Sequence, residues 1–331
     1  MSEEDNIPHL TPPARGYEVW FLTFTDPGSG RGYWIRSTYH GGPRGRQSMG
    51  SWFAQFDPAD PASTFGIHTG AKTWSVTKGD GDFNVRLDEN SLSSGRAEGS
   101  VAGGGHQARW SLEWQTGEPT YHLLPPALYR GPLLPTKPFS PNVSTLISGS
   151  ITVDGETTTI NGAPGQQGHL YGSRHAERWA WAHCSDFEDE DAVVHALTAQ
   201  GRRGPVLTPF LTVVGVRWQG RWIRFMKVNR RSDFRTMGRW SVDVGNRRYR
   251  LTGRIEAPIR SLLRARYEDP QGPPRFCHNS EIASSRLALF ERKAGGFEEV
   301  VLLESRGTTH AEWSGRTPAK VVEKEFIEVP V

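Results

Sequence analysis

The chain has 331 residues, 39 basic and 36 acidic side chains, and a formal net charge of +3 at pH 7. This length allows two ordinary domains or one large all-β domain, and the scattered charges argue against nucleic-acid binding, which needs a clustered basic face. No apolar run approaches the ~20 residues of a membrane span, and the acidic start Met1–Asp5 and the two cysteines predict a reduced, cytoplasmic protein rather than a secreted one.

Aromatic residues and turn-forming residues are both abundant, and together they predict an all-β fold. The chain contains 12 Trp, 15 Phe and 8 Tyr, and aromatic side chains bury a large area each. It also contains 37 Gly and 23 Pro, which leave little room for helices. Many short aromatic strands between turns are typical of β-barrels and β-sandwiches.

The first predicted hairpin pairs Tyr17–Thr25 with Gly32–His40 across the turn Asp26–Gly30. Further along, Tyr121–Pro141 holds six prolines, too many for a central strand, and we expect a long extended crossing there. Only Ile259–Tyr267 suggests a short helix or an irregular turn.

Four later hairpins are indicated by turn residues. The turns are Asp154-Gly155, Gln219-Gly220, Gly245-Asn246 and Gly295-Gly296, each between two strand-like segments. The order of strands and turns is loosely similar in the first and the second half of the chain. This similarity favours two β-rich units, residues 1–175 and 176–331, with a seam near residues 165–180. The alternative is one continuous large sheet system.

The most informative segment, Gly168–Cys184, lies at this seam. In an extended strand successive side chains point to opposite faces, so Trp179, Trp181 and His183 share one face, and the other carries small residues. Because ligand pockets are common where domains meet, we expect a pocket at this seam.

His183 is the sharpest candidate for chemistry, since a histidine can give or take a proton near neutral pH. A histidine held by a backbone carbonyl in a packed core is an equally good interpretation. Glu177 could assist it, or could simply pair with the arginines beside it in sequence.

A second polar segment runs from Phe276 to Glu281, and His278 and Glu281 could complete a site begun by His183. We expect substrate contacts from residues in and near both segments: Trp179, Trp181, Tyr171, Arg174, His175, Asn279 and Tyr129. The spacing of histidines and cysteines fits no common zinc signature, so no metal site is predicted. The short basic pairs Arg230-Arg231 and Arg247-Arg248 are interpreted as solvated strand faces.

The early aromatic strand Tyr17–Phe24, the turn at Asp26-Pro27 and the block His169–Cys184 leading into a second β half resemble the lipocalin-like two-barrel proteins. That superfamily includes the carotenoid 1,2-hydratases (hydroxyneurosporene synthases), the tocopherol cyclases and the lipocalin-like pericyclases. The resemblance implies two lipocalin-like antiparallel β-barrel or sandwich domains packed together. It also implies a long apolar substrate and no redox cofactor.

The favoured function is therefore a cofactor-independent enzyme that cyclises, hydrates or isomerises a lipophilic isoprenoid or polyene. Aromatic faces can stabilise a carbocation by roughly 0.5–2 kcal/mol per contact, and a dry pocket protects it from water. The alternative is a non-catalytic carrier of lipophilic ligands on the same fold. A carbohydrate-active protein would need a pair of carboxylates in a cleft, and the sequence offers no convincing pair.

Overall fold

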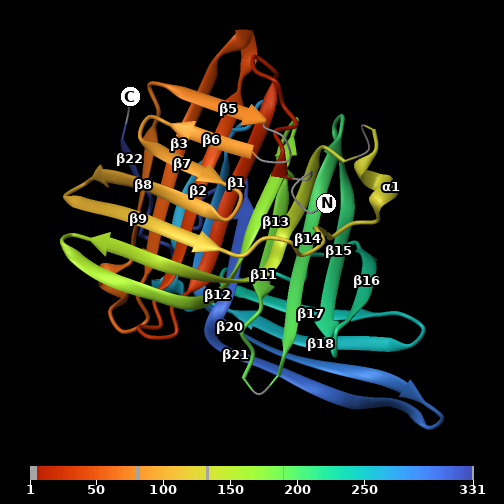
Figure 1. Ribbon diagram of the computed structural model, residues 1–331. Coiled ribbons are helices and arrows are strands. Elements are labelled where there is room, and N and C mark those ends of the chain that lie inside the picture. Colours follow the sequence, from red (N-terminus) through yellow and green to blue (C-terminus); the bar gives the residue numbers. More distant parts are fainter. Residues whose placement is uncertain (1–5, 79–82, 132–133, 189, 330–331) are drawn as a thin grey trace.

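The computed structural model describes residues 6–78, 83–131, 134–188 and 190–329, and nearly all of this chain lies in two curled antiparallel sheets (Figure 1). The all-β prediction is confirmed. The acidic start Met1–Asp5 lies outside the described residues. No helix in the described ranges is long and apolar enough to cross a membrane.

The first sheet contains thirteen strands among the described residues. In spatial order they are β22 (Ile327–Val329), β4 (Phe65–Gly70), β3 (Gln47–Phe56), β2 (Gly32–Gly41), β1 (Gly16–Thr25), β12 (Glu156–Gly172), β11 (Thr136–Val153), β9 (His106–Trp114), β8 (Arg96–Gly103), β7 (Asn90–Ser93), β6 (Phe83–Leu87) and β5 (Trp74–Lys78), with β10 (Tyr121–His122) paired to β11.

The second sheet contains nine strands in the same described ranges. They are β16 (Arg221–Asn229), β15 (Val206–Trp218), β14 (Ala192–Arg203), β13 (Arg178–Cys184), β21 (Gly296–Gly315), β20 (Arg275–Lys293), β18 (Tyr249–Glu256) and β17 (Arg239–Gly245), with β19 (Leu263–Tyr267) paired to β20. The one α-helix in the part of the chain that the structure describes is the short α1 (Pro126–Tyr129).

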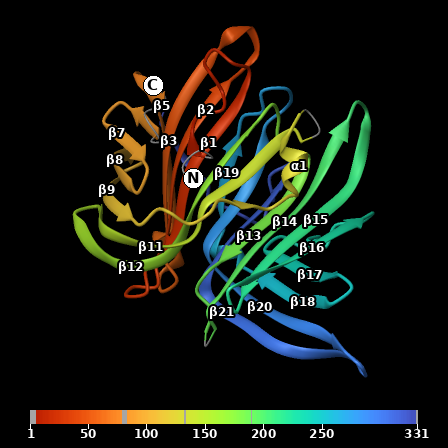
Figure 2. The same ribbon diagram turned by 45° about the vertical axis from the view of Figure 1, so that its right-hand side comes forward.

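The chain passes from the first sheet to the second between Gly172 and Arg178, and it returns to the first sheet only with β22, which pairs in parallel with β4. Two views show the second sheet lying beside the first (Figures 1 and 2), and β20 and β21 contact β1 of the first sheet. The single continuous sheet considered from the sequence is not formed. The division into units 1–175 and 176–331 stays a prediction.

Each sheet curls around its own apolar core. Trp20, Phe24 and Phe53 belong to the core of the first sheet, and Trp240 and Trp313 to that of the second. A third cluster joins the two sheets and combines Trp34, Trp52, Phe56, Trp179, Tyr267, Cys277 and Phe326.

Alternation along single strands creates this division of faces. On β13, Ala180, Ala182 and Cys184 pack in the core of the second sheet, whereas Trp179 and Trp181 point towards the first sheet. The alternation predicted for this strand is confirmed.

The predicted hairpins are present, but two other segments differ from expectation. Residues 259–261 form a 3-10 turn, and 263–267 form strand β19, because Leu263, Ala265 and Tyr267 alternate into the cluster between the sheets. The proline-rich crossing ends earlier than predicted, because β11 begins at Thr136. Of the two prolines in β11, Pro141 lies at a register shift between Phe139 and Asn142. Residues 132–133 of this crossing lie outside the described part of the chain.

Candidate active site

A cavity of about 340 Å³ lies between the facing surfaces of the two sheets, within the size range of small-molecule sites. Its lining comes from both sheets and from the crossing between β10 and β11. The residues are Tyr17, Val19, Phe21, Trp34, Arg36, Leu124, Leu134, Pro135, Thr136, Pro138, Phe139, Ser140, His169, Leu170, His175, Ala176, Trp179, Trp181, His195, Leu197, Ala199, Gly201, Arg203, Thr208, Pro209, Leu211, Val213, Tyr267, Asn279, Glu281 and Glu312.

Most of these residues are apolar, so the few titratable ones stand out. The carboxyl group of Glu281 on β20 is one of them, and the residue is only 3% exposed. Its Oε2 has no hydrogen-bond partner among the described residues. The pKa of Glu281 is raised to about 8, chiefly by burial and to a smaller extent by the nearby carboxyl group of Glu312, while the hydroxyl of Thr23 acts in the opposite direction. Glu281 therefore keeps its proton at pH 7 and can donate it.

Glu312 on β21 is the second buried carboxyl group of the cavity. Its Oε1 accepts a hydrogen bond from Trp179 Nε1 at 2.6 Å, and its Oε2 accepts one from Cys277 Sγ at 3.1 Å. Burial raises the pKa of Glu312, while these two donors and the positive charge of Arg36 act in the opposite direction. Two carboxyl groups with different hydrogen bonding thus lie at one cavity, which is the arrangement that separates an acid from a base.

Arg36 on β2 is the buried positive charge of the cavity. Its Nε donates to Thr38 Oγ1 at 2.7 Å. The guanidinium carbon lies 4.3 Å from the ring centre of Tyr267, and 5.3 Å and 5.4 Å from those of Trp52 and Trp34. Three aromatic rings, one of them from the second sheet, therefore fix the guanidinium at the junction.

A set of buried histidines lies beside the cavity. His195, which lines it, accepts a hydrogen bond from Trp181 Nε1 at 2.7 Å, so its proton is on Nδ1, 3.2 Å from Ser140 Oγ. Burial lowers the pKa of His195 well below its ordinary value, and the ring is neutral at pH 7.

Its strand neighbour His183 does not line the cavity and is fully buried. His183 Nε2 lies 2.7 Å from Val143 O and Nδ1 lies 3.3 Å from His310 Nδ1, while burial lowers its pKa to about 4. This is the carbonyl-bound core histidine that the sequence left open as the alternative. Its assignment as the catalytic acid stays a prediction.

The other two predicted catalytic residues lie away from the cavity. Glu177 forms ion pairs with Arg202 at 2.9 Å, Arg316 at 2.8 Å and Arg275 at 3.4 Å, in agreement with its interpretation as an ion-pairing residue. His278 Nδ1 donates to Trp313 O at 3.0 Å, and its Nε2 accepts from the backbone N–H of residue 319. The structure therefore does not bring His183, Glu177 and His278 together at one centre.

Of the seven predicted substrate-contact residues, Trp179, Trp181, His175 and Asn279 line the cavity. The other three do not. Tyr171 stacks against His9 with 4.1 Å between ring centres, and Arg174 hydrogen-bonds to the backbone oxygen of residue 202.

Tyr129, the third, donates to Pro138 O at 2.6 Å and secures the crossing beside the cavity. The sequence pattern groups Glu281 with His278, but it does not indicate Arg36 and Glu312. Arg36 is the one Arg, Lys, Asp or Glu of the aromatic strand β2, and that contrast is the signal by which it could have been found, whereas β21 carries several charged residues and gives no such signal for Glu312.

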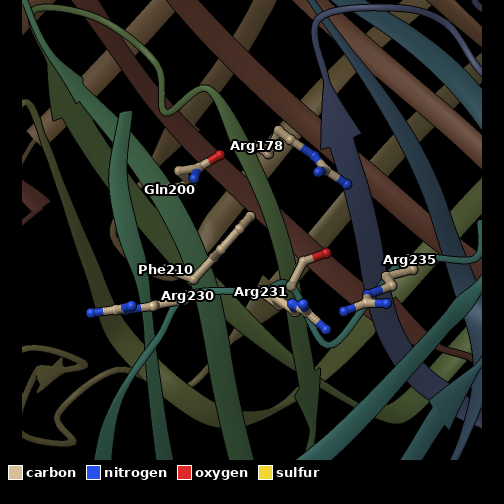
Figure 3. A pocket seen from close by; sticks show the side chains of 7 residues that line it. Arg178, Gln200, Phe210, Arg230, Arg231 and Arg235 are labelled. Atoms are coloured by element: carbon tan, nitrogen blue, oxygen red, sulfur yellow. The ribbon is translucent and has the colours of Figure 1, made fainter. Parts of the chain in front are cut away.

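A second concavity, at the end of the second barrel, is basic (Figure 3). Arg178, Arg230, Arg231 and Arg235 line it, and all four are exposed. Arg230 points away from the other three (Figure 3). The pairs 230–231 and 247–248 lie in bends after β16 and between β17 and β18, so placing them on strand faces was wrong. Because its arginines are solvated and diverge, this concavity is a poorer candidate than the enclosed cavity.

Comparison with known proteins gives the relatives of this chain. The family model described as tocopherol cyclase-like matches residues 143–315, more than half of the chain. An uncharacterized protein of Mycobacterium tuberculosis H37Rv, Rv0493c, is 24% identical over 327 residues, covering 96% of this chain and 92% of that protein.

Two solved structures share the fold. NE1406 from Nitrosomonas europaea, assigned to AttH, has a TM-score of 0.55 at 15% identity and covers 92% of this chain and 94% of its own. CghA with Sch210972 has a TM-score of 0.57 at 10% identity and covers 92% of this chain and 89% of its own. The lipocalin-like resemblance expected from the sequence is confirmed.

Proposed function

This chain belongs to the tocopherol cyclase-like family, and on that premise we propose that it is a cofactor-independent enzyme that cyclises, hydrates or isomerises a lipophilic isoprenoid or polyene-like molecule. The observation that carries the proposal is a buried carboxyl group, Glu281, whose Oε2 has no hydrogen-bond partner among the described residues and which lines an aromatic cavity between the sheets. Such a group can deliver a proton to a carbon–carbon double bond while water is kept away.

The proton passes from Glu281 to one alkene carbon, where a C–H bond forms as the π bond breaks, and a cation remains on the neighbouring carbon. The indole rings of Trp34, Trp179 and Trp181 line the same cavity and stabilise that cation, each by roughly 0.5–2 kcal/mol.

The cation then has two fates. Attack by a second double bond gives a cyclic cation that then loses a proton to the Glu281 carboxylate, and in the simpler case the first cation loses a different proton to the same carboxylate; either route gives a product of unchanged mass. Capture by water, followed by proton loss to the same carboxylate, gives a product heavier by one water. Both routes return Glu281 to its protonated form, so neither consumes an oxidant or a reductant.

The test is incubation of the purified protein with an apolar extract of its host, followed by mass-resolved chromatography. We expect a product of equal mass and shifted retention, or one heavier by a water, and its loss in Glu281→Gln. The matched control is Glu298→Gln, an exposed glutamate at the β20–β21 hairpin. A lipophile that stays bound but unchanged would support the carrier instead.

The sequence-based assignment of His183 is tested in the same assay. His183→Ala that retains ligand binding but loses turnover would transfer the role of the acid to His183. Turnover retained in His183→Ala and lost in Glu281→Gln is the result expected from the geometry of the cavity.

A further inference from the structure

Two arginines of this chain are buried, and their surroundings differ in one respect. Arg275, 3% exposed, lies 3.4 Å from a carboxylate oxygen of Glu177 and 3.8 Å from one of Asp269. Arg36, 6% exposed, has no carboxylate oxygen within 4 Å among the described residues. A buried charge is normally paired, and a guanidinium cannot escape the cost by losing its proton.

The donors of Arg36 are also incompletely used. Its Nε donates to Thr38, and this is its only hydrogen bond within the described part of the chain. The rings of Tyr267, Trp52 and Trp34 attract the charge through their faces, but they leave the donors of Nη1 and Nη2 without acceptors. Arg36 lines the cavity, so its free donors belong to the ligand site.

The other titratable groups near Arg36 do not supply the missing anion. Glu312 is the nearby carboxyl group on which the charge of Arg36 acts, but neither of its oxygens lies within 4 Å of the guanidinium nitrogens, and both accept hydrogen bonds from Trp179 and Cys277. His175 stays neutral because burial, with the positive charges of Arg36 and Arg275 as smaller causes, lowers its pKa to about 3. Burial likewise raises the pKa of Tyr17 and Tyr267, so both remain neutral phenols.

We propose that Arg36 binds a carboxylate group of the substrate, while the apolar remainder of the molecule fills the cavity. This inference rests on the proposed function and narrows its substrate class to acidic lipophiles. A guanidinium presents its donors as a flat fork that matches such a group through two parallel hydrogen bonds.

The rings around Arg36 support this assignment over a role in packing alone. They hold the guanidinium in one orientation from both sheets, so little freedom is lost when a ligand binds. A merely structural arginine at this junction would be expected to resemble Arg275, with its charge satisfied inside the protein.

The experiment compares dodecanoate with methyl dodecanoate, which share one chain and differ in charge. Binding to the full chain is followed by tryptophan fluorescence, since Trp34, Trp179 and Trp181 line the cavity. We expect the acid to bind about ten-fold or more tightly than the ester, the usual benefit of hydrogen bonds to a charged group. This comparison uses the unaltered protein and does not depend on a variant folding.

Variants then locate the preference. Arg36→Met should bind both probes alike, and Arg36→Lys should keep part of the preference, because it retains the charge without the fork. Arg266→Met is the matched control, since Arg266 lies on β19 but is 57% exposed and paired with Glu268 at 2.8 Å. Far-ultraviolet circular dichroism identifies variants that do not fold.

Equal affinity of the unaltered protein for acid and ester would overturn the role of Arg36 while leaving the lipophile cavity in place. Loss of the preference in Arg203→Met but not in Arg36→Met would also overturn it, because Arg203 lines the same cavity and is exposed. Binding of neither probe would overturn this inference and the proposed function together.

Discussion

Replacing the buried carboxyl group should change how stability depends on pH. In the folded chain Glu281 holds its proton up to a pKa of about 8, whereas its ordinary value is 4.5. Between these two values the folded state binds more protons than the unfolded state, so the free energy of unfolding falls as pH rises. At about 1.4 kcal/mol per pH unit, the full shift corresponds to an upper limit of about 5 kcal/mol.

Glu281→Gln removes this titration and keeps the shape of the side chain. Relative to the unaltered protein, we expect the variant to gain about 2–4 kcal/mol of stability between pH 5 and pH 8. Urea unfolding at several pH values measures the difference, and equal slopes against urea show that the same surface is exposed. The buried histidines are present in both proteins, so their titration cancels.

Two stability curves that run parallel from pH 5 to pH 8 would refute the reasoning, because Glu281 would then titrate alike in the folded and unfolded chain. Glu298→Gln serves as the control, and it should leave the shape of the curve unchanged.

Three further predictions concern the junction between the sheets. Gly32→Ala should destabilise the protein by about 1–3 kcal/mol, since a Cβ there would lie 2.6 Å from Glu281 Cβ, and thermal unfolding measures it. Arg275→Met should cost about 3–5 kcal/mol in urea unfolding, because it leaves the buried carboxylate of Asp269 without a cation among the described residues, although Glu177 keeps Arg202 and Arg316. Phe326→Ala should lower the free energy of unfolding by about 3–5 kcal/mol. It should also weaken dodecanoate binding, because Phe326 packs against the rings of Trp34 and Trp52 beside Arg36, and unchanged binding would contradict this.

The sequence was sufficient to predict the hairpins that carry clear turn residues and the aromatic face of β13 at the cavity. Trp179 and Trp181 could be placed on one face because a strand alternates, and neighbouring small residues showed which face packs into a barrel. Turn residues located the hairpins for a similarly local reason.

The polar centre of the cavity could not be predicted in this way. Glu281 and Glu312 come from one hairpin, but Arg36 comes from a strand distant in sequence, and it meets them only where the two sheets pack. His183 had the more conspicuous sequence context, but the backbone carbonyl that binds it belongs to β11, and no local pattern reports such a partner.

The return of β22 to the first sheet has a consequence for synthesis of the chain. The first sheet gains this edge strand, and Phe326 joins Trp34 and Trp52, only after more than three hundred residues have been translated. Domains otherwise tend to fold one after another as they leave the ribosome. In this chain the first sheet has its own core between residues 20 and 163, so what waits for β22 is its last edge strand and the aromatic cluster beside the cavity.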